Sequence, residues 1–259
     1  ARYKTQLKKN GVKLMSATEV ISDGPEGIIL VTGPTGSGKT VSLYSALAEL
    51  NRPDVNICSV EDPIEIPLTG LNQSQVNTKA GLSFQRVLRA LLRQDPDIIM
   101  VGEIRDGETA EIAIKAAQTG HLVLSTLHTN STVETVIRLQ QMGIARWMIA
   151  SALTLIIAQR LVRKLCPHCR RKSSTPVHLP AYLCASPLPD WSAPGCEHCY
   201  SGFYGRIALF EVLWVNDPLR QAIAQEMPAE KIAHIASEQG VMTLFEHGCR
   251  AVEAGETTL

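Results

Sequence analysis

Residues 28–40 read IILVTGPTGSGKT and join a short apolar run to a glycine-rich loop. The segment from Gly33 to Thr40 matches the pattern G-x-x-x-x-G-K-[ST] at every fixed position. The apolar run predicts a strand that enters the loop, and the residues from Lys39 onward predict a helix that leaves it. Backbone N–H groups of such a loop, together with the positive end of the helix, hold phosphate oxygens. The segment therefore predicts a nucleotide phosphate site within an α/β domain.

The loop also assigns individual roles. The expected nucleotide-binding residues are consecutive: Gly33, Pro34, Thr35, Gly36, Ser37, Gly38, Lys39, Thr40 and Val41. Lys39 should reach the β and γ phosphates, and the Thr40 hydroxyl should coordinate Mg²⁺. The alternative is an ordinary glycine-rich turn, but a full match arises by chance in only about one chain in a hundred of this length.

Three further apolar runs predict strands, at Val55–Val60, Ile98–Val101 and Leu122–Leu127. Helical spacing of apolar residues separates them, for example at Val41–Leu50 and Leu82–Gln94. Strands this apolar have no face that prefers water, so their alternation with helices predicts a mainly parallel sheet covered on both sides. Ligands of such sheets bind beyond the carboxyl ends of the strands.

Charged and polar residues follow those strand ends. Glu61, Glu103 and His128 come just after the second, third and fourth strands. Either glutamate can serve as the base or water-orienting group of a hydrolysis. We assign Glu61 to water, Glu103 to Mg²⁺ through water, and His128 to sensing the γ phosphate, which with Lys39 makes the expected catalytic set. The competing interpretations are solvated loop carboxylates and a structural histidine.

Two Cys-x-x-Cys units stand 26 residues apart, Cys166–Cys169 and Cys196–Cys199. Two tight turns that each present two thiolates suit the tetrahedral preference of Zn²⁺. We expect these four cysteines to hold a structural zinc ion, with a redox pair or idle thiols as the alternatives. His168 and His198, one inside each unit, leave open which atoms bind.

The composition limits the function classes. Lys+Arg and Asp+Glu both total 25, so no overall basic field favours a nucleic acid partner. The run Trp147–Ala158 is too short to span a membrane and predicts a buried helix. The first residues show no export signal, which predicts a cytoplasmic protein without a transmembrane segment.

Changes in composition suggest four regions. Residues 1–23 form a linker or the remnant of another domain, 24–164 the nucleotide-binding core, 165–205 the zinc module, and 206–259 a shortened helical subdomain. Within the last region, helical spacing covers Leu219–Glu226, Ala229–Glu238 and Leu244–Ala254.

Nearly the whole chain resembles the secretion ATPases of type II secretion and type IV pilus assembly. The motifs that carry the resemblance are the phosphate loop, Val60–Glu65, Leu92–Asp106, Thr119–His121, Leu127–Asn130, Ala158–Arg163, both cysteine units, Gly205–Arg206 and Phe210–Leu213. The cysteine module is similar to that of the assembly-type members.

The resemblance implies a RecA-like P-loop NTPase core and ATP hydrolysis that depends on Mg²⁺. It also implies a homo-hexamer that works at the inner membrane of a bacterium, against a platform protein and its secretion or pilus machinery. Gly102 stands where many such enzymes keep an aspartate that orders Mg²⁺. Two departures from the family are expected to matter for hydrolysis and ring closure: only Ala1–Gly27 stands where the family has a further domain, and the chain stops at Thr257–Leu259, where the family's last helix would continue. A nucleic-acid-translocating motor and a nucleotide-binding switch without turnover are the alternative functions.

Overall fold

The computed structural model describes residues 27–184 and 186–259, so the predicted linker at residues 1–23 lies outside the described residues. The chain forms two compact units. The first comprises the residues up to Ala158 together with Val212–Val241, and the second comprises Gln159–Glu211 with Met242–Leu259.

One seven-stranded sheet contains the four expected strands, in the order β3-β2-β4-β5-β1-β6-β9. Each of the pairs β1–β5, β1–β6, β2–β3, β2–β4 and β4–β5 is parallel, which confirms the predicted α/β fold with a mainly parallel sheet. The strands are β1 Gly27–Thr32, β2 Ile57–Glu61, β3 Asn72–Gln75, β4 Ile98–Val101, β5 Leu122–Leu127, β6 Leu153–Leu165 and β9 Phe203–Trp214. Sequence patterns did not indicate β3, because the edge strand NQSQ carries no apolar side chain.

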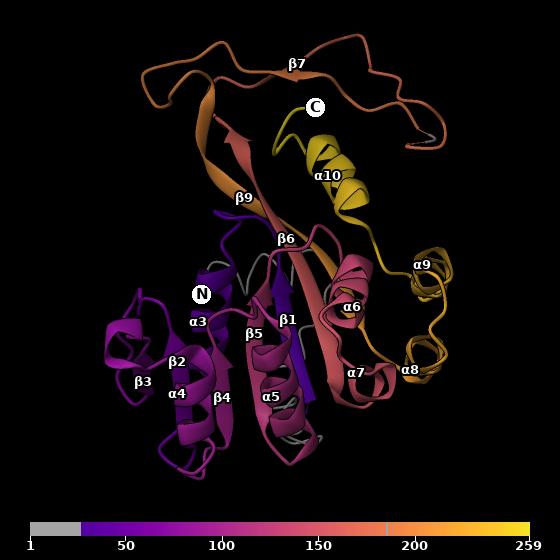
Figure 1. Ribbon diagram of the computed structural model, residues 1–259. Helices are drawn as coiled ribbons and strands as arrows, with labels where there is room; N and C mark the ends of the chain where they lie inside the picture. The colour runs from indigo at the N-terminus through magenta and orange to yellow at the C-terminus, as the bar shows by residue number, and fades with distance from the viewer. Residues whose placement is uncertain (1–26, 185) are drawn as a thin grey trace. The chain divides into compact units, whose positions relative to one another are not determined.

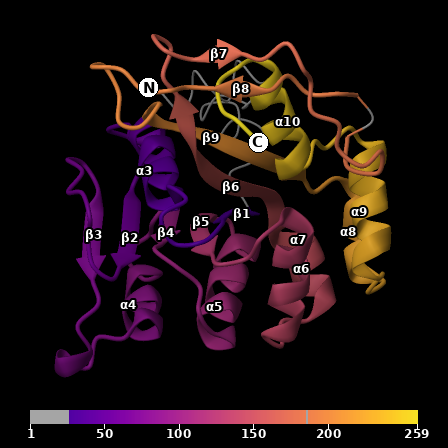
Figure 2. The same cartoon turned by 90° about the horizontal axis from the view of Figure 1, so that it is seen from above.

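Helices cover both faces of the part of the sheet that belongs to the first unit. Figures 1 and 2 show α3 on one face and α4, α5, α6 and α7 on the other. The helices of this unit are α3 Lys39–Leu50, the short 3₁₀ helix η1 Thr78–Ala80, α4 Phe84–Leu91, α5 Gly107–Gln118, α6 Thr132–Gln141, α7 Arg146–Ala152, α8 Asp217–Ala224 and α9 Ala229–Glu238.

The apolar side chains of β1, β2, β4 and β5 alternate between the two layers. In β4, Ile98 and Met100 pack in the core that includes α3, whereas Ile99 and Val101 pack in the larger core on the other face. In β2, Ile57 belongs to the α3 core, so the period of two along a strand places Glu61 on that same face. The fold thus turns Glu61 toward the helix that follows the phosphate loop.

The prediction of one buried helix at Trp147–Ala158 is wrong. Helix α7 ends at Ala152, and β6 begins at Leu153 and pairs with the central strand β1. The run Leu153–Ile157 contains three β-branched residues, which favour a strand, and its buried backbone groups gain partners from β1. Periodicity could not distinguish the two, because a short continuous apolar run fits either structure.

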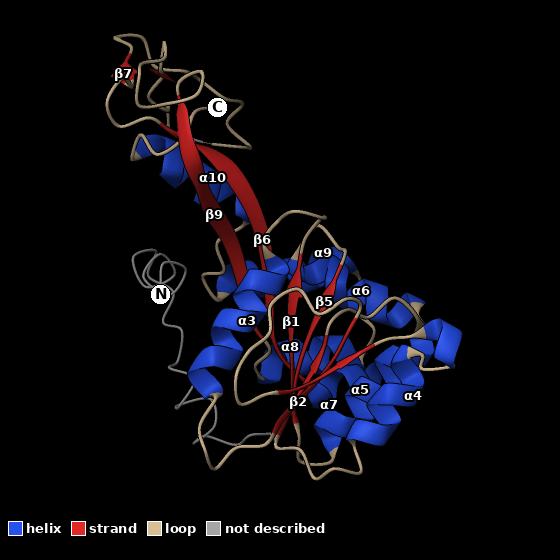
Figure 3. Cartoon of the chain, turned by 90° about the vertical axis from the view of Figure 1, so that its left-hand side faces the viewer, coloured by secondary structure: helices blue, strands red, loops and turns tan. Residues whose placement is uncertain are grey.

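The second unit contains little regular structure apart from its long strands. Between β6 and β9, Figure 3 shows mostly loop. Its remaining elements are β7 Arg171–Lys172, β8 Trp191–Ser192 and the helix α10 Leu244–Glu253. The predicted domain boundaries stay predictions, but the helical description of 206–259 needs correction, since residues 206–214 lie in β9.

Candidate active site and metal centre

The phosphate loop joins β1 to α3 and is shaped by glycines. Gly36 and Gly38 have φ angles of 80° and 88°, which side chains other than glycine rarely adopt. The Lys39 ammonium lies against the loop and donates to the carbonyl oxygens of Gly33 at 2.7 Å and Pro34 at 3.0 Å. The first amides of α3 have no side-chain cap, since Gly38 occupies the N-cap position. The loop and helix start therefore offer N–H groups and a cation to an anion.

Glu61 ends β2 and is almost fully buried, with 3% of its surface exposed. Its Oε1 accepts hydrogen bonds from Ser59 at 2.6 Å and Gln73 at 3.0 Å, and its Oε2 accepts one from the Tyr44 hydroxyl. Burial, together with the hydrogen bond to Glu61, raises the pKa of Tyr44 to about 12. The tyrosine consequently keeps its proton and acts as a donor to the carboxylate.

Glu103 lies just beyond β4 and contacts two cationic or potentially cationic groups. Its Oε1 forms an ion pair with Arg105, and its Oε2 lies 3.4 Å from Nε2 of His128. The Glu103 carboxylate raises the pKa of the Arg105 guanidinium, first through the hydrogen bond and then through charge. In this structure Arg105 therefore pairs with an acidic residue of its own chain.

Main-chain contacts join the two glutamates. The amide of Gly102 donates to the carbonyl of Val60 at 2.8 Å. A Cβ at Gly102 would meet Val60 O at 3.3 Å and the Glu61 Cα at 3.4 Å. Because the end of β2 fills the space beside residue 102, Gly102 lets the ends of the two strands that carry Glu61 and Glu103 lie against each other.

Threonine hydroxyls link the His128 segment back to the phosphate loop. Thr32 Oγ1 donates to the carbonyl of Thr129 at 3.0 Å, and the Thr129 amide donates back to Thr32 Oγ1 at 3.0 Å. The Gly33 amide also donates to the carbonyl of Leu127 at 3.3 Å. Contacts therefore form a closed series, from α3 through Glu61 and Glu103 to His128 and back to the loop.

Other residues singled out by sequence lie at the margin of this cluster or away from it. The Thr40 hydroxyl reaches the exposed Glu65 at 3.5 Å, a long contact. Val41 is 40% exposed on the first turn of α3. His121 precedes β5, at the opposite end of the strand from His128, and its Nδ1 lies 2.9 Å from the Ala116 carbonyl oxygen.

Three contacts of Glu61 were not foreseen from the sequence. Tyr44 occupies an apolar position of a helical pattern, where an aromatic residue usually indicates only the core. The contact with Ser59 is the one that the sequence could have indicated, because Ser59 stands two residues before Glu61 and therefore lies on the same face of β2. Gln73 comes from the polar strand β3, which the sequence did not indicate.

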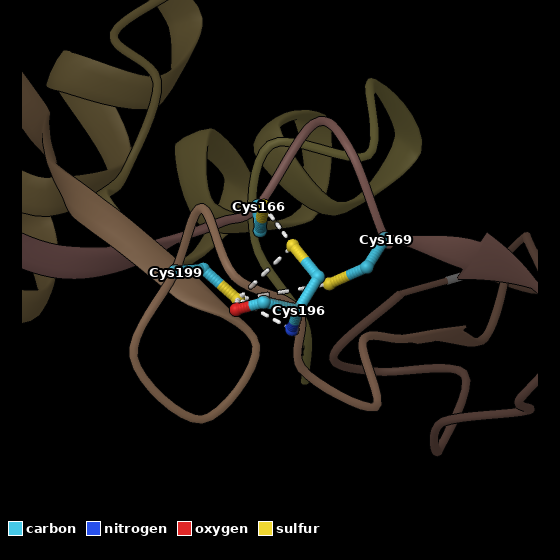
Figure 4. Close-up of side chains that lie close together, drawn as sticks. All are labelled: Cys166, Cys169, Cys196 and Cys199. Carbon is cyan, nitrogen blue, oxygen red and sulfur yellow. Dashed lines mark hydrogen bonds between the residues drawn. The ribbon is translucent and has the colours of Figure 1, made fainter.

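The four predicted zinc ligands converge in the second unit (Figure 4). All four sulfur atoms lie within 4.8 Å of one another. The distances Cys166–Cys196 and Cys169–Cys199 are both 3.8 Å, and Cys196–Cys199 is 3.7 Å. A tetrahedral zinc site with Zn–S bonds of about 2.3 Å requires sulfur atoms about 3.8 Å apart. The sulfurs thus have the spacing of four zinc ligands rather than of disulfides.

Acid–base properties of the cluster also suit a metal. Burial raises the pKa of the Cys199 thiol, but hydrogen bonds from the amides of Cys196 and Gly202 outweigh it and lower the value to about 7. The His198 amide lowers the pKa of Cys196, but burial and neighbouring thiols raise it to about 12. Cys199 therefore forms a thiolate readily, and its negative charge disfavours ionisation of the neighbouring thiols. A bound cation would offset the repulsion between the thiolates.

The imidazole rings of the histidines inside the cysteine units, His168 and His198, contact each other at a tilt of 44°, with centroids 4.5 Å apart. Both are exposed, and the four-residue ligand set consists of cysteines.

Among the described residues, no helix combines the length and apolar character that crossing a membrane requires.

Curated proteins are similar to most of this chain. The protein transport protein HofB homolog of Escherichia coli is 70% identical over 90% of this chain and 51% of its own length. The type IV pilus assembly ATPase PilB of Pseudomonas aeruginosa is 50% identical over 91% of this chain and 42% of its own length. The chain thus spans about half the length of these relatives.

A solved structure shows the same fold. The crystal structure of the pilus retraction motor PilT with bound ADP superimposes with a TM-score of 0.71 at 31% identity, over 93% of this chain and 61% of that chain. The family model for type II/IV secretion system proteins matches residues 5–259. The chain accordingly belongs to the family of type II/IV secretion system proteins.

Proposed function

We propose that this chain is the motor region of an ATPase that hydrolyses ATP to drive type IV pilus assembly or type II protein secretion. The observation that carries the proposal is the closed series of contacts that connects the phosphate loop with Glu61, Glu103 and His128. Relatives named as a pilus assembly ATPase and a type II secretion system protein support the choice of process.

In this proposal the phosphate loop, Gly33–Val41, binds the nucleotide. The loop backbone and the first turn of α3 face the phosphates, and the Lys39 ammonium exchanges its carbonyl partners for the β and γ phosphate oxygens. A lysine already held inside the loop needs little reorganisation for this exchange. ATP rather than GTP follows from the family resemblance, since phosphate contacts carry no information on the base.

Hydrolysis itself is assigned to the carboxylates and the imidazole. Glu61 orients a water molecule whose oxygen attacks the γ phosphorus, and accepts the proton as the bond to ADP breaks. His128 donates to the γ phosphate. Bound Mg²⁺ would neutralise charge on the phosphate oxygens, held by the Thr40 hydroxyl and, through water, by Glu103. For Glu103 to hold a water molecule of the Mg²⁺ ion, Arg105 must give up its ion pair with Glu103 Oε1.

The cysteine cluster is proposed to hold a structural Zn²⁺. Four protein ligands complete its tetrahedral coordination, so no position remains for a substrate. Cys166, Cys169, Cys196 and Cys199 would each contribute one thiolate. The ion would fix the loop-rich segment between β6 and β9.

The finer biological assignments rest on the family resemblance. We propose a homo-hexamer on the cytoplasmic side of a bacterial inner membrane, associated with the membrane through a platform protein rather than through a span of its own. An arginine supplied by a neighbouring subunit would suit the loose transition state of phosphoryl transfer.

The decisive experiment measures phosphate release by the purified protein and by Lys39→Ala. Loss of the ammonium should lower kcat at least about hundredfold, because it removes a preorganised charge from the transition state. Lys115→Ala is the matched control, since Lys115 is an exposed lysine paired with Glu111 on α5. Equal turnover by Lys39→Ala and the unaltered protein would refute the catalytic assignment.

Two further readouts separate the alternatives. Hydrolysis that DNA stimulates with a steep salt dependence would indicate a nucleic acid motor instead. Tight ATP binding without any phosphate release would indicate a nucleotide-dependent switch.

A further inference from the structure

Tyr44 connects the phosphate-loop helix to the end of β2. It lies on α3, one turn beyond Thr40, and only 4% of its surface is exposed. Its ring packs in the core between α3 and the sheet. Its hydroxyl group makes polar contacts beyond that core. The hydroxyl donates a hydrogen bond to Glu61 Oε2 and accepts hydrogen bonds from the amides of Glu65 at 3.3 Å and Ile66 at 3.5 Å.

The carboxylate of Glu61 has a limited number of acceptor positions, about two on each oxygen. Oε1 already accepts from Ser59 and from Gln73. Oε2 accepts from Tyr44. Among the contacts of the described chain, the remaining acceptor position therefore lies on Oε2, beside the tyrosine hydroxyl. Tyr44 fixes the orientation of the carboxylate, and that orientation would determine where a water molecule bound to Oε2 lies.

We propose that Tyr44 is a positioning residue that orients the Glu61 carboxylate and donates a hydrogen bond to it during hydrolysis. The inference rests on the proposed ATPase function and adds a residue to it. A donor that faces a carboxylate favours its charged form, and it fixes the rotation of the group. Because its own proton is retained far above neutral pH, Tyr44 supplies this donor throughout the range in which the protein works.

The same hydroxyl also holds the main chain after Glu61. Glu65 and Ile66 donate their amides to it, and Glu65 approaches the Thr40 hydroxyl through its side chain. One side chain thus ties the carboxylate, the segment that follows it, and the helix that carries Lys39. This explains why a buried helix position holds tyrosine, where phenylalanine would fill the core equally well.

The test compares Tyr44→Phe with the unaltered protein and with Tyr204→Phe. The control removes the hydroxyl from a tyrosine that is 64% exposed in the second unit. For Tyr44→Phe we expect kcat to fall about tenfold, the size expected for a lost hydrogen bond to a charged group. The acid limb of the kcat–pH profile should move up by about one pH unit, while KM and the dissociation constant for ATP stay within about twofold.

A second variant keeps the packing and the hydroxyl, in case Tyr44→Phe does not fold. Incorporation of 3-fluorotyrosine at position 44 makes the hydroxyl a more acidic, stronger donor. The acid limb should then move to lower pH, opposite to the change for phenylalanine. A role confined to packing predicts no movement in either direction.

The outcomes distinguish the role of Tyr44 from the ATPase function itself. A wild-type pH profile and kcat for Tyr44→Phe, in a protein that loses turnover with Lys39→Ala, would overturn only the role of Tyr44. Loss of ATP binding in parallel with kcat would also overturn it, because it would make Tyr44 a structural residue. Absence of hydrolysis by the unaltered protein would overturn both proposals.

Discussion

The carboxyl edge of the parallel strands, where Lys39, Glu61, Glu103 and His128 lie, and the cysteine cluster both bring together residues from distant parts of the sequence. They do so by different means. At the sheet edge, parallel register and two apolar cores place Lys39, Glu61, Glu103 and His128. Between residues 166 and 202, by contrast, only Cys166, Leu188 and Gly202 are buried among the described residues. The strands there are two residues long.

The difference indicates what stabilises the folded structure of each region. Burial of apolar surface on both faces stabilises the sheet edge, so its geometry is set before a ligand arrives. The cysteine segment buries little apolar surface to offset the entropy of ordering its loops, so we expect a bound metal to supply that free energy. Chelation and mutation should therefore affect the two regions very differently.

The largest expected effect is the loss of structure in the cysteine segment without metal. Cys166→Ser or Cys199→Ser should reduce bound zinc from about one ion per chain to almost none, since three ligands bind far more weakly than four. Limited proteolysis should then cut between residues 166 and 202, while ATP binding persists. Cys58→Ser is the control, because Cys58 is a buried thiol of β2 outside the cluster.

Absence of metal in the unaltered protein by elemental analysis would contradict this prediction. So would loss of ATP binding on chelation, since it would mean that the sheet edge is not independently stable.

The second prediction concerns the two carboxylates. Glu61→Gln should lower kcat by about 10²–10⁴-fold, the range of general acid–base contributions, with little change in zinc content. Glu103→Gln should instead raise the Mg²⁺ concentration required for half-maximal activity. Steady-state rates across a Mg²⁺ titration check both, and exchanged phenotypes would reverse the roles assigned here.

A third, intermediate effect is expected at the turn after the second cysteine unit. Gly202 has a φ angle of 85°, and a Cβ there would overlap the Ala193 carbonyl oxygen. Gly202→Ala should destabilise the segment by roughly 2–4 kcal/mol and weaken zinc binding in competition with a chelator.

Gly205→Ala provides the matched comparison. Gly205 has a φ angle of 74°, but nothing lies within 4 Å of its added Cβ. Its cost should be only about 1 kcal/mol of backbone strain. Equal chelator sensitivity of the two variants would mean that the close approach to Ala193 has no role.

The smallest predicted effect is at the N-cap of α5. Asp106 accepts from the Thr109 amide at 2.8 Å, and its replacement by alanine should lower the unfolding free energy by about 1 kcal/mol. Burial raises the pKa of Asp106, but hydrogen bonds from Thr109 and Gln85 lower it overall. The stabilisation is thus present above the ordinary aspartate pKa of about 3.9 and is lost as the pH falls through the lowered folded value.

Urea unfolding of wild type and Asp106→Ala at pH 7 and pH 3 measures this difference. The gap between the two proteins should narrow at the lower pH. A gap that widens on acidification would contradict the assigned sign.

The sequence predicted those features whose chemistry is local. Gly33–Thr40 and the paired cysteines carry their geometry in their spacing, so residue order alone was enough to predict the loop and the sulfur cluster. Glu61 and Glu103 could be placed because parallel strands end at one edge. By contrast, the partners of Glu61 depend on which face of β2 meets α3, and that follows from tertiary packing.

The same limit explains the misassigned segment at Leu153. Its helix-or-strand choice depends on an open edge beside β1, which no local pattern reports. The contacts of Glu61 with Tyr44 on α3 and Gln73 on β3 are likewise tertiary results. Sequence reasoning thus identified the reactive groups better than the side chains that hold them.

The crowding at Gly102 has a practical consequence for redesign. An aspartate installed at this position would bring its Cβ to 3.3 Å from the Val60 carbonyl oxygen and 3.4 Å from the Glu61 Cα, so the end of β2 would have to move by a few tenths of an ångström to admit it. Because Glu61 is the residue that would move, restoring an acidic group at position 102 would shift the carboxylate assigned to water, and the two changes would have to be designed together.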